Sequence, residues 1–137
     1  MRFSKVLLAA FCLALIPAFA GAVVINEIRI DQPSSDNDEY FELAGDSGES
    51  LDGLTYVVIG DGTGGSGVVE TAADLSGLVI PADGHFLAAE STFTGSCGGT
   101  VDLTTTLNFE NGDNVTHLLV TNFTGAVGDD LDVDEDG

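Results

Sequence analysis

The stretch Ala22-Val-Val-Ile-Asn-Glu-Ile-Arg-Ile30, taken with Asp38-Glu-Tyr-Phe-Glu-Leu43, decides the fold of this chain. The first run is rich in β-branched residues, which favour strands. The intervening residues, Asp31-Gln-Pro-Ser-Ser-Asp-Asn37, are typical of turns. The sequence therefore predicts a β-hairpin at the start of the domain.

Alternation along the first strand predicts which side chains share a face. One face should carry Val24, Asn26, Ile28 and Ile30, and the other Val23, Ile25, Glu27 and Arg29. Asn26 would then be a hydrogen-bonded amide in the core. Glu27 beside Arg29 allows two interpretations: a recognition or catalytic carboxylate, or a structural group paired with Arg29, Glu39 or Glu42. We favour the structural role, because buried polar groups need partners.

Outward from the hairpin, the apolar runs are short and separated by turn signals. They lie at residues 54–59, 68–70, 78–80, 85–89, 101–109 and 115–120. The run 54–59 is almost continuously apolar, which indicates a central strand. Residues 60–67 contain five glycines and predict a loop. With no helical pattern after residue 20, we expect an all-β sandwich of about seven short strands.

The N-terminus has the features of a bacterial secretory signal peptide, which we expect to be helical. Arg2 and Lys5 precede the apolar run 6–16, and Ala18-Phe-Ala20 fits the small-x-small cleavage rule. The apolar run is too short for a transmembrane span. We therefore expect export, with cleavage after Ala20 or Ala22, and a secreted or cell-surface location.

Charge and cysteine content exclude other classes of protein. Without residues 1–20 the chain keeps one base, Arg29, against 23 acids, so its formal charge is 1 − 23 = −22. Such a surface repels phosphate backbones, which argues against nucleic-acid binding. Only Cys97 remains after cleavage, so an intrachain disulfide scaffold is excluded.

Several motifs, taken in order, resemble the lamin-tail domain, a small immunoglobulin-like β-sandwich. They are Asn26-Glu27 with Glu39-Tyr-Phe-Glu-Leu43, then Leu51-Asp-Gly-Leu-Thr-Tyr56, then Leu78-Val-Ile-Pro-Ala-Asp-Gly-His-Phe-Leu87, and finally Phe109-Glu-Asn-Gly-Asp-Asn-Val115. The resemblance spans roughly residues 23–125. Two departures are the absence of tryptophan and an Asp-rich end where the family has a further strand.

The resemblance implies a secreted or surface-associated bacterial module without catalytic residues of its own. Similar domains often lie beside nuclease or other hydrolase domains, where binding or anchoring is their presumed role. We therefore divide the chain into a signal peptide at 1–20, a lamin-tail-like domain at 22–125 and an acidic tail at 126–137. The extracellular or cell-surface partner is not identified by the sequence.

Three further features could indicate cofactor binding, catalysis or metal binding. Gly60-Asp-Gly-Thr-Gly-Gly65 matches a dinucleotide-binding pattern, but no helix start follows it and Asp61 would repel phosphate. Cys97 lacks the neighbouring cation that activates a nucleophile, so an exposed thiol that could pair between chains is favoured. His85 and His117 are interpreted as strand residues, with metal binding as the alternative. We predict no catalytic and no cofactor-binding residue.

The C-terminus carries the one pattern typical of a metal site. Asp132, Asp134, Asp136 and Gly137 occupy positions 1, 3, 5 and 6 of the calcium-loop pattern Asp-x-Asp-x-Asp-Gly. The alternative is an acidic tail that stays solvated because its charges repel one another. The sequence thus predicts a Ca²⁺ site formed by these three aspartates.

The most favoured function is that of a secreted, non-catalytic binding or surface-associated module, stabilised by calcium. One alternative is an N-terminal fragment of a longer secreted hydrolase or nuclease, with this domain as its accessory part. An in-frame continuation past Gly137 into a hydrolase would favour that alternative. Another is an acidic, calcium-dependent extracellular matrix protein.

Overall fold

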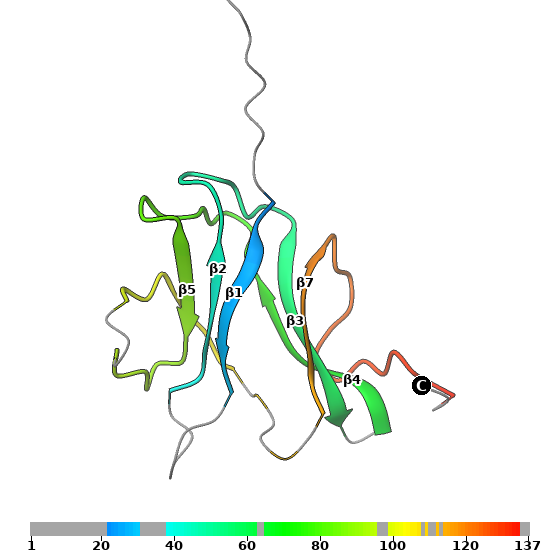
Figure 1. The fold of residues 1–137 in the computed structure, drawn as a ribbon. Coiled ribbons are helices and arrows are strands. Elements are labelled where there is room, and N and C mark those ends of the chain that lie inside the picture. Colours follow the sequence, from blue (N-terminus) through cyan, green and yellow to red (C-terminus); the bar gives the residue numbers. More distant parts are fainter. Residues whose placement is uncertain are drawn as a thin grey trace, which may run out of the picture.

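The computed structural model describes residues 22–30, 38–62, 65–95, 99–107, 109, 112 and 114–134. Within these ranges the chain is all-β, with seven strands and no helix. The strands are β1 (Val24–Arg29), β2 (Tyr40–Ala44), β3 (Leu54–Gly62), β4 (Gly65–Asp74), β5 (His85–Ala89), β6 (Leu103–Thr104) and β7 (Thr116–Thr121). They form two sheets, of order β1-β2-β5-β6 and β4-β3-β7 (Figure 1). This two-sheet arrangement is consistent with the expected sandwich.

The predicted hairpin is present, but the predicted faces of its first strand are wrong. β1 pairs with β2 in antiparallel register, and the register shifts between Ile25 and Glu27. Asn26 is thus an extra residue in a β-bulge, and alternation restarts after it. Consequently Val23, Ile25, Ile28 and Ile30 all pack against the core. Asn26 is exposed instead of buried. The predicted turn at 31–37 lies outside the described residues.

β3 is the central strand of the second sheet, as its apolar sequence predicts, with β4 and β7 on its two sides. The predicted glycine loop is wrong, because β3 continues to Gly62 and β4 begins at Gly65. A Cβ on Gly62 would lie 2.6 Å from Val68 Cγ1 of β4. Glycine therefore permits the close approach of the two strands. The strand predicted at 68–70 is the middle of the ten-residue β4.

Two other predicted strands are shorter than expected. In 78–80, only Val79 forms an isolated bridge, to Ser50. Among the described residues of 101–109, the strand is limited to Leu103–Thr104, which pairs in parallel with β5. Leu107 and Phe109 are then buried in the core. The chain thus leaves the sheet after β6 and contributes these two side chains to the core.

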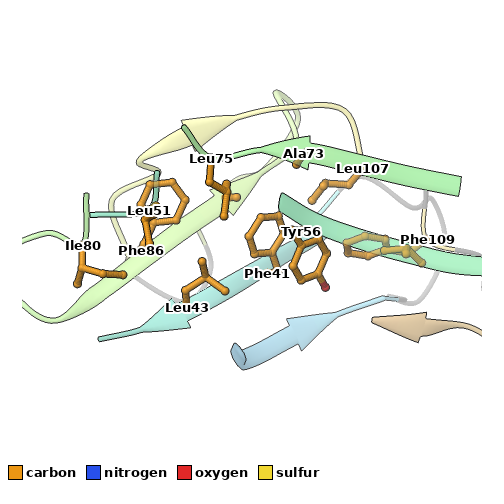
Figure 2. Packing of buried hydrophobic residues seen from close by; sticks show 12 residues of the cluster. Phe41, Leu43, Leu51, Tyr56, Ala73, Leu75, Ile80, Phe86, Leu107 and Phe109 are labelled. Carbon is orange, nitrogen blue, oxygen red and sulfur yellow. The ribbon is translucent and has the colours of Figure 1, made fainter. Parts of the chain in front are cut away.

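The core lies between the two sheets and is centred on aromatic rings. The rings of Phe41, from the first sheet, and Tyr56, from the second, stack with centroids 3.7 Å apart. Figure 2 shows this pair between Leu43 on one side and Phe109 on the other. A second, smaller cluster of Tyr40, Leu87 and Ala89 packs against Phe93 and Val101. Phe93 and Val101 therefore anchor the chain around them to the first sheet.

After β7 the chain continues to β4. Val69 N donates to Asp129 O, Gly128 N to Val69 O, and Leu131 N to Gly67 O, over 2.9, 2.8 and 3.0 Å. An antiparallel bridge joins Val68 to Asp130. Residues 128–131, which the sequence assigns to the acidic tail, thus lie along the outer edge of β4, shown in red in Figure 1.

Candidate functional site

The strand pairing of the first sheet places two carboxylates of its outer face opposite each other. Glu27 of β1 is the register partner of Glu42 of β2. Like charges in this position destabilise a strand pair unless other groups compensate them. Here Tyr40 Oη donates to Glu27 Oε1 over 2.6 Å, and Asn26 Nδ2 donates to Glu42 Oε1 over 2.6 Å. Both glutamates thus serve as hydrogen-bond acceptors, and the donor to Glu27 is Tyr40.

Glu39, which the sequence indicates only as a partner of Glu27, is a buried carboxylate. Its side chain is 5% exposed. Phe109 N donates to both of its carboxylate oxygens, over 3.3 and 3.2 Å. Since these residues are 70 positions apart in the chain, this bond ties the segment before β7 to the start of β2. Glu39 therefore has a structural role.

A hollow of about 370 Å³ lies beside the start of β5, between residues 81–83 and residues 99–102. We name it the His85 hollow. Its lining comprises Glu42, Pro81, Ala82, Asp83, His85, Leu87, Gly99, Thr100 and Asp102. Three carboxylates and one imidazole thus surround a small apolar surface. No lysine or arginine is among the lining residues, so the hollow has a negative potential.

Local hydrogen bonds position the polar groups of the His85 hollow. Asp102 Oδ2 accepts from Leu87 N over 2.8 Å, while Asp102 N donates to Leu87 O. His85 Nδ1 lies 3.2 Å from Asp83 O. A proton on Nδ1 satisfies that carbonyl and leaves Nε2 as an acceptor. The hollow can therefore take a ligand that donates hydrogen bonds and carries positive charge.

His117 lies on β7, as predicted, in a separate aromatic environment. Its Nδ1 is 2.7 Å from Tyr56 Oη, and the Phe109 ring meets it edge-on at 4.9 Å. Its Nε2 is buried and makes no hydrogen bond. Burial lowers the pKa of His117 and raises that of Tyr56. Both side chains are thus neutral near pH 7 and form a structural pair.

The glycine pattern at 60–65 does not form a phosphate-binding loop, since its described residues belong to β3 and β4 and the following segment is a strand. Cys97 and the signal peptide lie outside the described residues. Of the three aspartates predicted to bind calcium, Asp132 and Asp134 are described and Asp136 is not. Asp132 Oδ2 accepts from Ser66 Oγ over 3.1 Å.

Two findings apply to the described part of the chain alone. It contains no group of three or more histidine, cysteine, aspartate or glutamate side chains placed to hold a metal ion. It also contains no helix long and apolar enough to cross a membrane.

Sequence reasoning did not bring together the residues of the His85 hollow. Glu42, His85 and Asp102 all belong to predicted strands, and Asp83 precedes His85 in a turn, but nothing in the sequence aligns these strands with one another. The sequence Pro81-Ala-Asp-Gly84 is typical of a turn and places Asp83 two positions before His85. Comparison of the chain with protein-family models, with curated proteins and with solved structures finds no match. Fold and site thus define an all-β, two-sheet domain with an acidic, ligand-sized hollow.

Proposed function

We propose that this chain is a secreted, non-catalytic binding module of the lamin-tail type, with an immunoglobulin-like sandwich fold. The ordered lamin-tail motifs and the two-sheet, all-β architecture support this class. The observation that carries the binding function is the His85 hollow. Its ligand is a cationic group, such as a primary ammonium or guanidinium on a cell-surface or extracellular partner.

The composition of the hollow favours binding of a cation. Three carboxylates attract positive charge, and exclusion of water by a bound ligand strengthens that attraction. Pro81, which is partly exposed and lines the hollow, offers apolar contact to the methylene groups of a lysine or arginine side chain. Asp102 is engaged with the backbone of Leu87, and Glu42 with Asn26. Carboxylates held in this way orient a ligand, which favours binding over catalysis.

An NMR titration of the mature protein tests the His85 hollow. Nα-acetyl-lysine methylamide should shift the ring signals of His85 and saturate with a Kd of about 1 mM, which corresponds to about −4 kcal/mol. Sodium acetate should cause no such shift. Glu42→Gln keeps an oxygen for Asn26 but removes the charge, and should weaken binding at least about threefold. Asp74→Asn, on the other sheet, should leave the affinity unchanged. Equal shifts with acetate, or equal loss in both variants, would contradict the proposal.

Secretion is part of the same proposal and has its own test. The small residues around Ala20 support cleavage after Ala20 or Ala22. Intact-mass measurement on protein from the culture medium and from the cell surface should give a chain that starts at Gly21 or Val23. Retention of Met1 would contradict export by this signal.

The proposed module also binds Ca²⁺ through Asp132, Asp134 and Asp136. The spacing of the three carboxylates supports this site, and Asp132 is already positioned by Ser66. The expected Kd is on the order of 10⁻⁴ to 10⁻³ M, as in extracellular modules. Calorimetric titration of Ca²⁺ into the mature protein should show this site, and Asp132→Ala/Asp134→Ala should abolish it. Equal binding by both proteins would assign the ion to diffuse surface charge.

A further inference from the structure

We propose that the outer edge of β4 is a docking site for an extended, basic segment of a partner protein. Residues 126–134, here named the C-terminal segment, occupy this edge, and the partner must displace them in order to bind. The edge belongs to the second sheet and does not share residues with the His85 hollow. The two sites can therefore be tested separately.

The edge of β4 already holds an extended chain. Three backbone hydrogen bonds join Gly67 and Val69 to Gly128, Asp129 and Leu131. The backbone N–H and C=O of Asp130 point away from β4, because its neighbours Asp129 and Leu131 make the hydrogen bonds to that strand. This is the antiparallel geometry by which a sheet edge takes up a peptide strand. The structure thus shows the binding mode with the chain's own residues as occupant.

Side-chain packing holds the C-terminal segment only weakly. Its apolar side chains Val127, Leu131 and Val133 are 62, 55 and 81% exposed, and these are the three highest values among the exposed large apolar residues described. Burial of apolar surface is the main source of stability for docked elements. Backbone bonds and the contact between Ser66 and Asp132 join the segment to β4. A partner strand with apolar contacts of its own can displace it.

The acidic chain around the edge of β4 favours a partner segment that carries positive charge. Beyond Val127, a groove of about 530 Å³ continues along β4, lined by Glu70, Thr71, Ala72, Thr105, Thr106 and Val127. The only lysine or arginine among the described residues is Arg29, on the other sheet. A segment that alternates lysine or arginine with apolar residues matches this edge. A second copy of the chain is disfavoured, because two molecules of charge −22 repel each other.

Hydrogen exchange distinguishes displacement from surface binding. The probe is a short peptide that alternates lysine and valine. It is added to the protein that lacks only the signal peptide, residues 1–20. Displacement should remove the protection of the Leu131 amide, which loses its acceptor Gly67 O. The Val69 amide should stay protected, because the peptide replaces Asp129 as its acceptor. A glutamate–valine peptide, and a lysine–valine peptide interrupted by prolines, should have no effect.

Two proline variants test whether the C-terminal segment competes with the partner. Leu131→Pro removes an N–H that bonds to β4, so the C-terminal segment should dissociate from the edge in a larger fraction of molecules. The affinity for the peptide should therefore rise at least about fivefold. Val127→Pro is the matched control: Val127 is the second residue of the turn 126–129, in which Gly128 has a φ of 91°. Proline suits that position, so the affinity should stay within about twofold. The Leu87 amide, bonded to Asp102, reports that both variants remain folded.

Each remaining outcome overturns the proposal. Absence of binding, or equal affinity in the two variants, shows that the C-terminal segment does not guard a docking site. Binding that shifts His85 signals while the Leu131 amide stays protected places the cationic peptide in the His85 hollow; the proposed function then stands and the edge site fails. Dimerisation of Leu131→Pro in sedimentation without peptide identifies a second copy as the occupant.

Discussion

Replacement of Tyr56 by phenylalanine tests the aromatic centre of the core. The Tyr56 side chain is fully buried and stacks on Phe41, and a phenylalanine ring preserves that contact. The hydroxyl lies 2.7 Å from His117 Nδ1, so its removal breaks one hydrogen bond. It also leaves the ring of His117 with no described hydrogen-bond partner, because Nε2 already makes no hydrogen bond.

The expected loss of stability follows from these two effects. A typical intramolecular hydrogen bond contributes about 1 kcal/mol net, and an unsatisfied buried polar group costs about 1–3 kcal/mol. Because His117 is only half-buried, we expect the lower part of this range. Tyr56→Phe should therefore lower the free energy of unfolding by about 1–2 kcal/mol and the Tm by roughly 4–8 °C for a domain of this size.

Urea unfolding at pH 7.5, followed by circular dichroism, measures this loss, and a second variant separates its cause. Tyr56→Phe/His117→Phe removes both partners and leaves no unpaired polar group, so it should be more stable than Tyr56→Phe alone. A loss below about 0.5 kcal/mol in Tyr56→Phe would refute the assignment of a structural bond. So would a double variant that is no more stable than the single one.

Three other predictions concern the same fold. Burial lowers the pKa of His117, so on acidification this histidine is protonated in the unfolded chain before it is protonated in the folded one. The free energy of unfolding should therefore fall as the pH drops from about 6.5 toward the lowered pKa. The variant Tyr56→Phe/His117→Phe should show a flatter dependence of stability on pH in this window. The Tm should rise between about 0.02 and 1 M NaCl, because screening relieves repulsion within a chain whose formal charge is −20. A flat series would show that the acids are compensated locally. Glu39→Ala should lower the free energy of unfolding by about 1–3 kcal/mol, because Phe109 N loses its acceptor. The control Glu42→Ala, on the outer face of the sheet, should change it by less than about 1 kcal/mol. Similar losses in the two variants would contradict the structural role of Glu39.

Local patterns predicted part of the fold correctly. Composition and turn residues indicated an all-β chain, and the hairpin of β1 with β2 and the central β3 are confirmed. The glycine-rich stretch was misinterpreted because glycine is common in both loops and closely packed strands. The faces of β1 were assigned wrongly because a bulge at Asn26 depends on pairing with β2, which strict alternation ignores.

The candidate site was less accessible to sequence reasoning. His85 was identified as a strand residue, but nothing in its neighbourhood indicated that Asp102 lies beside it. The bond from Leu87 N to Asp102 spans 15 residues and forms only because β6 returns alongside β5. The pairing of Tyr56 with His117 spans 61 residues. Such contacts depend on how strands align, and each strand's own pattern is compatible with several alignments.

The amino-acid sequence by itself determines the class of structure, the strongly acidic surface and the position of the first hairpin, because these depend on composition and on neighbours along the chain. Tertiary structure alone decides which strand edges meet, which carboxylates share a hollow and how residues 128–131 cover β4. Val69 and Asp129 illustrate the reason: their bond joins two backbones far apart in sequence, and backbone groups carry no residue-specific signal. Only the folded arrangement of the sheets brings them within hydrogen-bond distance.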